Sequence, residues 1–415
     1  MEEGCFVDAY KVLTLEDAVN YIRQYIDIFS SKDELVAKQV SGNSPSVDGY
    51  VNVIIAISSV ENKKSVILKQ MMPHVTSPIR ENVHKLIPLD RIKAEVDSIK
   101  FWDTICPNSV PKIYVWDDVN KIIIMEDLSR LKIMSSELLK RKKFPALPKQ
   151  LGEFLGKTAF YTSDLFLTHK EKRDLQNRFT TCNIKYLWDD FMFVGTILDN
   201  SNYHINVKIK EEIDNFCSNR KIRQEVIRLR DIYVNKMQCL IHSDLHTSNI
   251  FVDSTEMKVF DTEYATYGPI SFDIGRILGS IILSYASLFG LEDISKKEKK
   301  DYQEYLLEMI EGIYQEFSDT FHKAWMRHSN KSNDYQTYYN QLYRKSILKE
   351  TIGFIACSSI SRIYDEGLPF DFRRIDDLEQ RGIGQKFIIK LAEQLLLDGK
   401  KIDEIEELTG MIKDL

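Results

Sequence analysis

This sequence of 415 residues has few cysteines, no surplus of basic residues and no long uninterrupted apolar run. Each of these shortages argues against a class of protein. The formal net charge is −6, which argues against a nucleic-acid-binding protein, since such proteins usually carry a surplus of lysine and arginine. No C-x-x-C pair occurs, so we expect the reduced thiols of a cytosolic protein, and neither a disulfide framework nor a zinc site. The six cysteines are Cys5, Cys106, Cys182, Cys217, Cys239 and Cys357.

No apolar stretch is long and uninterrupted enough to predict a membrane span. The longest run, residues 274–291, reads IGRILGSIILSYASLFGL and is interrupted by Arg276 and by several glycines and serines. A span needs about 20 mostly apolar residues, so this run predicts a buried core helix. The first ten residues, MEEGCFVDAY, contain neither a basic nor an apolar segment, and we expect no signal peptide and a cytoplasmic location.

The stretch that carries recognisable chemistry is residues 240–273. His242, Asp244 and Asn249 follow the pattern H-x-D-x-x-x-x-N, and two short β-like runs come next, the second of which ends on Asp261. Loop, strand, turn, strand and acidic terminus form the order of a kinase catalytic loop and its metal-binding hairpin. The alternative is a chance triplet in a loop with a capping aspartate. The asparagine and the hairpin, both in register, favour the kinase interpretation.

Phosphoryl transfer explains why these residue types are needed. One carboxylate must lie near the attacking hydroxyl, and oxygen ligands must hold the Mg²⁺ that neutralises the triphosphate. Asp244 suits the first role, and Asn249 and Asp261 suit the second. We therefore predict ATP and Mg²⁺ as cofactors and a small molecule as the acceptor.

A nucleotide-binding lobe is predicted in the N-terminal part of the chain. There are two β-like runs on either side of a polar turn, at residues 37–40 and 50–58. A third β-like run, at residues 65–70, contains Lys69. The order of strand, turn, strand and lysine-bearing strand is that of a kinase small lobe. Because the turn has few glycines, a plain hairpin with a solvated lysine is the alternative.

A possible ion-pair partner for Lys69 supports the prediction of a kinase small lobe. Glu95 lies 26 residues further on, in a stretch (residues 89–102) with the apolar spacing of an amphipathic helix. In kinases such a glutamate orients the lysine toward the α- and β-phosphates of ATP. The alternative is that Glu95 is one solvated charge among several on the helix.

A hinge is predicted after the strands at residues 112–116 and 122–125. Backbone groups of a kinase hinge bind the adenine edge, and apolar side chains line the pocket. The order of the elements alone assigns Met125, Glu126 and Leu128 to the ATP site.

We predict an α+β protein with the bilobal fold of protein kinases, with an antiparallel sheet and a helix in the small lobe and a large, mainly helical lobe. The length allows two or three subdomains. The predicted boundaries are residues 1–126 for the nucleotide-binding lobe, 127–134 for the hinge and 135–415 for the helical catalytic and substrate lobe. Helical spacing in the large lobe recurs over residues 151–164, 170–190, 208–239, 297–328, 338–363 and 383–397.

Several motifs together resemble a known family. The sequence is similar to the aminoglycoside- and choline-kinase-like small-molecule kinases and, within them, to the S-methyl-5-thioribose kinases. The most specific segments are the catalytic loop and a D-x-E motif followed by YGP and FDIG. The motifs are DGYVNV (48–53), SVILKQMMPHV (65–75), LDRIKAE (89–95), MEDLS (125–129), FLGKTAFYTSDL (154–165), HSDLHTSNIF (242–251) and FDTEYATYGPISFDIG (260–275).

The resemblance implies an ATP-dependent sugar kinase that phosphorylates the 1-hydroxyl of methylthioribose in methionine salvage. It implies that Asp244 is the catalytic carboxylate, that Asp261 and Glu263 lie near metal and substrate, and that Lys69 and Glu95 clamp the phosphates. It also implies a homodimer, with no nucleic acid or membrane as partner.

Two further roles follow from the same resemblance. The DGYVNV motif places Asp48, Gly49 and Asn52 in the phosphate-binding loop. Asp273 is expected to brace the catalytic loop and to have a structural role.

The sequence departs from the family at positions that concern the acceptor. Ser243 stands where the family has glycine, and Lys349-Glu350 stand where it has a twin arginine at the sugar site. Lysine and glutamate do not replace two guanidinium forks, because the bidentate donors and a net charge are lost. The predicted substrate contacts are Asp244, Glu263, Lys349, Arg373 and Arg374.

Two other functions therefore stay open. One is a kinase of another hydroxylated metabolite or antibiotic, such as a deoxysugar, choline, homoserine or an aminoglycoside. The other is a catalytically inactive nucleotide-binding or scaffold protein, which is disfavoured because the polar positions needed for transfer are all present.

Overall fold

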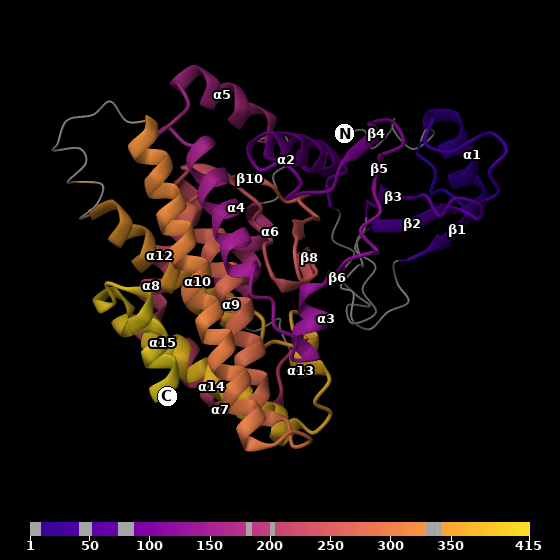
Figure 1. Cartoon of the computed structure of the whole chain (residues 1–415). Helices are drawn as coiled ribbons and strands as arrows, with labels where there is room; N and C mark the ends of the chain where they lie inside the picture. The colour runs from indigo at the N-terminus through magenta and orange to yellow at the C-terminus, as the bar shows by residue number, and fades with distance from the viewer. Residues whose placement is uncertain are drawn as a thin grey trace, which may run out of the picture.

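The computed structural model describes residues 10–40, 52–73, 87–179, 185–199, 204–328, 338 and 342–415. It has a small lobe built on a sheet and a large lobe built on helices (Figure 1). Asp48 and Gly49, predicted for the phosphate loop, lie outside the described residues.

The small lobe is one antiparallel sheet with the strand order β1-β2-β3-β5-β4. Its register sets Lys69 on β3 opposite Ile54 on β2 and Ile123 on β5. The lysine therefore lies in the middle of the sheet, with a paired strand on either side. The strands are β1 (Leu35–Gln39), β2 (Asn52–Ser59), β3 (Ser65–Met71), β4 (Ile113–Asp117) and β5 (Ile122–Glu126).

Alternation along β5 explains why two helices cover the sheet. Successive strand side chains point to opposite faces, so Ile122 and Ile124 pack in one cluster and Ile123 and Met125 in another. Helix α1 (Leu15–Tyr25) joins the first cluster, and helix α2 (Arg91–Ile105) joins the second.

Local signals place the first of these helices. A capping box at Thr14 and Asp17 starts α1, because each side chain accepts a hydrogen bond from the other residue's backbone N–H. The helix then buries Ala18 and Ile22 against the sheet.

The large lobe is a stack of long helices that run side by side (Figure 1). Its elements are β6 (Lys132–Ile133), α3 (Met134–Leu139), α4 (Leu147–Tyr161), α5 (His169–Arg178), α6 (Lys185–Asp189), the π-helix η1 (Asp190–Leu198), η3 (Val207–Ile209), α7 (Lys210–Ser218), α8 (Arg220–Asn235), β7 (Cys239–Ile241), η4 (Thr247–Asn249), β8 (Ile250–Val252), β9 (Met257–Val259), β10 (Thr266–Gly268), α9 (Ile270–Ser287), η5 (Leu288–Gly290), α10 (Lys296–His328), α12 (Arg344–Ser361), α13 (Phe370–Arg373), α14 (Leu378–Asp398), η7 (Gly399–Lys401) and α15 (Ile405–Asp414).

Helix α9 is the centre of this lobe. It is long and apolar enough to cross a membrane, but 89% of its most apolar window is buried inside the protein. The predicted core helix is thereby confirmed. Close packing against α12 depends on Gly275, since a Cβ there would lie 2.5 Å from the Cβ of Phe354.

Two details of the helical lobe were not predicted from the sequence. Residues 208–239 do not form one helix: the chain breaks at Asn219, whose side chain accepts from the backbone N–H of Lys221 and caps α8. After α6 the chain continues as the π-helix η1, which the apolar spacing did not predict.

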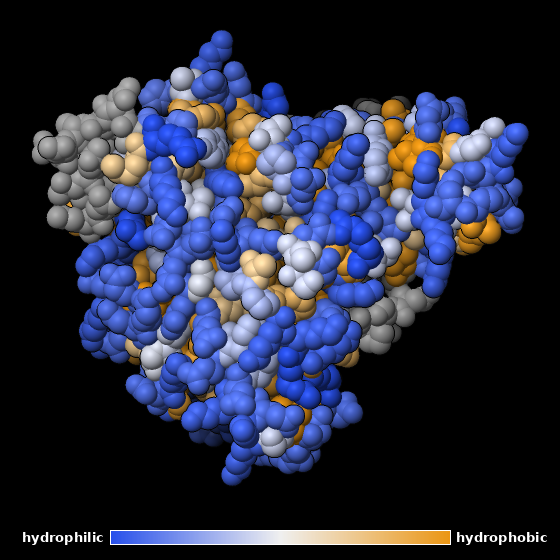
Figure 2. Space-filling view, in the orientation of Figure 1, coloured by the Kyte–Doolittle hydropathy of each residue, from blue (hydrophilic) through white to orange (hydrophobic). Residues whose placement is uncertain are grey.

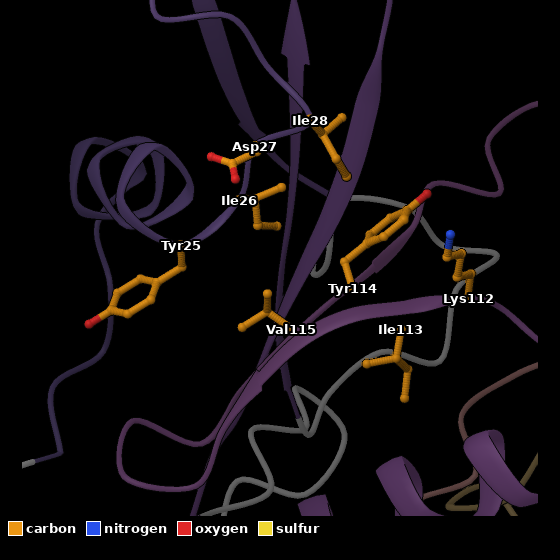
Figure 3. A pocket seen from close by; sticks show the side chains of 8 residues that line it. All are labelled: Tyr25, Ile26, Asp27, Ile28, Lys112, Ile113, Tyr114 and Val115. Atoms are coloured by element: carbon orange, nitrogen blue, oxygen red, sulfur yellow. The ribbon is translucent and has the colours of Figure 1, made fainter.

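The surface of the two lobes differs in character. Figure 2 shows hydrophilic residues over most of this face of the helical lobe, and hydrophobic colour gathered on the small lobe beside α1. A cavity of about 320 Å³ lies there, lined by residues 25–28 and 112–115 (Figure 3). Its lining includes none of the predicted site residues.

Candidate active site

The loop at residues 242–249 is fixed by the first turn of α9. Asp273 accepts hydrogen bonds from the backbone N–H groups of His242 (2.6 Å) and Ser243 (2.9 Å). His242 also links the loop to the hairpin, since its Nε2 lies 2.9 Å from the backbone oxygen of Phe260. Ser243 has φ 68°, a left-handed conformation that a side chain rarely adopts, which explains why a glycine suits this position.

Asp244 projects from this loop beside two basic side chains. One carboxylate oxygen accepts a hydrogen bond from the Arg276 guanidinium and lies 3.5 Å from Nε2 of His246. Burial alone would raise the pKa of Asp244, but the charges of His246 and Arg276 outweigh burial and hold the pKa well below its usual range. Burial lowers the pKa of His246, although the Asp244 carboxylate opposes this effect.

Lys69 is clamped between the lobes. Its Nζ lies 2.7 and 2.9 Å from the carboxylate oxygens of Glu95 on α2 and 2.5 Å from Asp261, at the end of the hairpin. Burial would lower the pKa of Lys69, but the Asp261, Glu95 and Glu263 carboxylates raise it. The lysine is therefore charged, and the structure brings together three residues that the sequence separates by up to 192 positions.

Carboxylates crowd around this lysine. Ligand oxygens of Glu95, Asp261 and Glu263 lie within 4.8 Å of one another, close enough to share a metal ion. Asp261 is the most exposed of the three, at 32%, and adopts φ 62°. Asp261 and Glu263, the two carboxylates predicted for Mg²⁺, both belong to this cluster, and Mg²⁺ prefers oxygen ligands.

Glu263 is held by a network that the sequence did not predict. Asn52 donates from its side-chain amide to Glu263 (2.7 Å), and Arg91 Nε lies 3.4 Å from the same oxygen. Arg91 is fully buried and also donates to the Asn52 side-chain oxygen. Asn52, predicted to bind ATP, thus has partners at the carboxylate cluster.

Asn249 lies at the other end of the catalytic loop. Its amide nitrogen donates to the backbone oxygen of Asp244 (2.9 Å). Its predicted place among the metal ligands stays a prediction.

The predicted hinge residues follow β5. Met125 and Leu128 are buried, as expected for the wall of a nucleotide pocket. The Glu126 carboxylate accepts from Lys258 (2.6 Å), so its side chain serves the packing of β5 against the hairpin.

The basic residues predicted for the substrate make other contacts. Lys349 pairs with Asp403 (3.2 Å) near the C-terminus. The Arg373 guanidinium donates to the backbone oxygen of Leu368, and that of Arg374 to Leu139 (3.2 Å). Their role at the acceptor stays a prediction.

The structure instead brings Arg276 to Asp244, the carboxylate predicted to be catalytic. In the sequence, Arg276 was noted only as an interruption of an apolar run. The signal that could have found it is its position, three residues after Asp273 and so on the adjacent turn of the same helix.

Comparison with known proteins connects this geometry with phosphotransferases. Residues 200–291 match the model of the phosphotransferase enzyme family. The methylthioribose kinase of Pectobacterium atrosepticum is 26% identical over 404 residues, covering 97% of this chain and 98% of that protein. That of Bacillus velezensis is 28% identical over 406 residues, covering 97% of both.

A solved structure supports the same fold. The choline kinase from Cryptosporidium parvum has a TM-score of 0.50 and 16% identity, and covers 93% of this chain and 98% of that one. The predicted bilobal α+β kinase fold is confirmed, as is the resemblance drawn from the motifs, since the chain is similar over nearly its full length to methylthioribose kinases.

Proposed function

We propose that this relative of the methylthioribose kinases is itself an ATP-dependent kinase that phosphorylates the 1-hydroxyl of 5-methylthioribose, a step of methionine salvage. The full-length similarity to those kinases supports the acceptor. The observation that carries the reaction type is the meeting of Lys69 with Glu95 and Asp261, because it joins a phosphate-gripping lysine to a catalytic lobe.

Asp244 is assigned to the attacking hydroxyl. Its buried ion pair with Arg276 keeps the carboxylate ionised, so that it can accept a hydrogen bond from the acceptor hydroxyl and orient it. A strong base is not needed, since phosphoryl transfer depends mainly on positioning and electrostatic stabilisation.

The nucleotide side is assigned to the small lobe and its hinge, residues 1–126 and 127–134, with the acceptor held by residues 135–415. Lys69 would bind the α- and β-phosphates, and Mg²⁺ held by Asp261 and Glu263 would neutralise the transferred group. The remaining proposed contacts to ATP or metal are Asp48, Gly49, Asn52, Met125, Glu126, Leu128 and Asn249.

One observation favours a different acceptor for the same machinery. Lys349 and Glu350 stand where the family has its twin arginine, and Glu350 bonds to Lys236 and Ser271. The alternative is therefore a kinase of another hydroxylated metabolite or antibiotic.

A coupled ADP-release assay on purified protein separates these functions. We expect turnover on methylthioribose in a panel that also contains ribose, choline, homoserine and an aminoglycoside. Turnover on another acceptor alone would replace the methylthioribose assignment.

Asp244→Asn tests the assigned chemistry in the same assay. The variant should lose turnover and keep the rise in Tm that ATP causes, because Asp244 lies outside the Lys69 cluster. An exposed aspartate variant, Asp301→Asn, is the matched control. Unchanged turnover in Asp244→Asn would show that another group orients the hydroxyl.

A further inference from the structure

Arg276 is a charged residue inside the most buried helix of the protein. Its side chain is 1% exposed, and the residues around it on α9 are almost all apolar. Burying a guanidinium costs free energy unless its charge is paired and its N–H groups are bonded. The partners of Arg276 therefore indicate what the residue is for.

Three groups hold the guanidinium in place. One Nη donates to the Asp244 carboxylate, the other lies 3.3 Å from the sulfur of Met192, and the Trp188 ring lies 4.3 Å from the guanidinium carbon. Stacking on an aromatic ring and bonding to a carboxylate fix the plane of an arginine, which lysine could not reproduce. The guanidinium is thus held rigidly at the catalytic carboxylate.

Two donors on this stacked pair, Arg276 Nε and Trp188 Nε1, are buried and have no hydrogen-bond partner among the described residues. Buried polar groups are nearly always bonded, so two orphan donors side by side call for an acceptor oxygen from elsewhere. The Trp188 ring also meets the ring of Tyr264 edge-on at 5.5 Å, which connects the pair to the residue next to Glu263.

The Asp244 carboxylate already has cationic partners inside the protein. Arg276 bonds to it and Arg362 also acts on it, so Asp244 has less need of a cationic acceptor to balance its charge. The surplus of carboxylates lies on the nucleotide side, at Glu95, Asp261 and Glu263.

We propose that Arg276 is an acceptor-binding residue, whose guanidinium, stacked on Trp188 and tied to Asp244, donates to an oxygen of the acceptor and selects an acceptor without positive charge. This inference rests on the proposed kinase function and adds to it the residue that distinguishes a polyhydroxyl acceptor from choline or an aminoglycoside. Arg276 also provides a guanidinium from α9, which Lys349 and Glu350 cannot provide.

The test compares Arg276→Lys and Arg276→Met with wild type and with Arg344→Lys, an arginine bonded to Ser318 elsewhere in the large lobe. KM and kcat are measured for methylthioribose and for choline, with KM for ATP as the internal reference. We expect Arg276→Lys to raise KM for methylthioribose about tenfold, the loss of one good hydrogen bond, with KM for ATP within about twofold of wild type. Arg344→Lys should match wild type.

Other outcomes overturn the inference or the function separately. A fall in kcat at unchanged KM would show that Arg276 only positions Asp244, and would overturn its role in binding. If wild type turns over a different acceptor of the panel, the methylthioribose assignment fails, and the same KM comparison with that acceptor still tests Arg276. Turnover of choline or an aminoglycoside by wild type would overturn the charge selection. Should Arg276→Met fail to fold in a Tm measurement, Arg276→Lys alone decides.

Discussion

Asp273 bridges the backbone N–H groups of His242 and Ser243, with distances of 2.6 and 2.9 Å. The bridge joins the first turn of α9 to the catalytic loop, so that the carboxylate lies near the positive end of the helix and binds two more donors. It holds Ser243 at φ 68°, a conformation that costs about 1–2 kcal/mol for a residue with a side chain.

Asp273→Asn should weaken this bridge. An amide offers one acceptor oxygen, and its NH₂ group would face a backbone donor. We expect the free energy of unfolding to fall by about 2 kcal/mol, the cost of losing a buried charge-assisted hydrogen bond, and kcat to fall because the loop no longer holds Asp244 in place. Urea unfolding and steady-state kinetics measure the two effects. Equal stability of the variant and wild type would show that the bridge contributes nothing.

Ser243→Gly should act in the opposite direction on stability. Glycine adopts positive φ freely, and the Ser243 hydroxyl is buried without a hydrogen-bond partner among the described residues. We expect a gain of about 1 kcal/mol in the free energy of unfolding, measured by urea unfolding. A loss of stability would mean that φ at this position is not a source of strain.

Lys69 and Glu95 should act as a unit in ATP use. Lys69→Met removes the phosphate-binding charge, and Glu95→Gln removes the group that orients it, so each should lower kcat/KM for ATP by about 100-fold, the loss that a misplaced group produces. The double variant should be little worse than Lys69→Met, because the glutamate acts through the lysine. Lys172→Met, another buried lysine paired with a carboxylate, is the matched control.

If the losses in kcat/KM of the two single variants add up in the double variant, Glu95 does not act through Lys69. Such additive losses would show that Glu95 and Lys69 contribute independently, for example if Glu95 bound the metal and Lys69 the phosphates. The comparison therefore distinguishes an ion-pair role for Glu95 from a ligand role in the three-carboxylate cluster.

The Mg²⁺ requirement should depend on Asp261 more than on Glu263. Asp261 is 32% exposed and can reach a bound ion, whereas Glu263 is 2% exposed and accepts from Asn52. We expect Asp261→Asn to raise the Mg²⁺ concentration for half-maximal rate by at least about tenfold, and Glu263→Gln to raise it less. An Mg²⁺ titration of initial rates gives both values. An Asp261→Asn curve that overlays wild type would remove Asp261 from the metal site.

Local patterns in the sequence predicted much of this fold, because each has a direct physical cause. The apolar run at residues 122–125 predicted a strand, and Ile122 and Ile123 indeed serve opposite faces of the sheet. The pairing of Lys69 with Glu95 was also predictable, since the order of strand and helix restricts which charges can meet.

The acceptor side could not be predicted in the same way. Arg276 is a single charge in an apolar run and Arg91 is one of several charges on its helix, and their partners come from segments far away in the chain. Periodicity reports which face of an element is buried, but it does not report which buried charge faces a carboxylate. The π-helix η1 shows the same limit, because the tertiary contacts of its residues decide its backbone pattern.

Lys185 should make stability rise with pH above about pH 8. It is half-buried against α8, with Nζ 3.0 Å from the Tyr233 backbone oxygen, and this burial lowers its pKa to about 8 from the usual 10.5. Between these two values the unfolded chain binds more protons than the folded one, so the penalty of burying the charge is full below pH 8 and disappears toward pH 10.5. Lys185→Met removes that penalty. We therefore expect the free energy of unfolding of the variant, relative to that of wild type, to decrease by about 2 kcal/mol between pH 7 and pH 10.5. The full pKa shift would correspond to roughly 3 kcal/mol, but the side chain keeps some contact with water, which reduces the effect. Urea unfolding of both proteins at each pH gives this difference. Lys221→Met, a substitution of an exposed lysine, is the control. A difference that stays constant with pH would show that Lys185 has the same pKa in the folded and the unfolded chain.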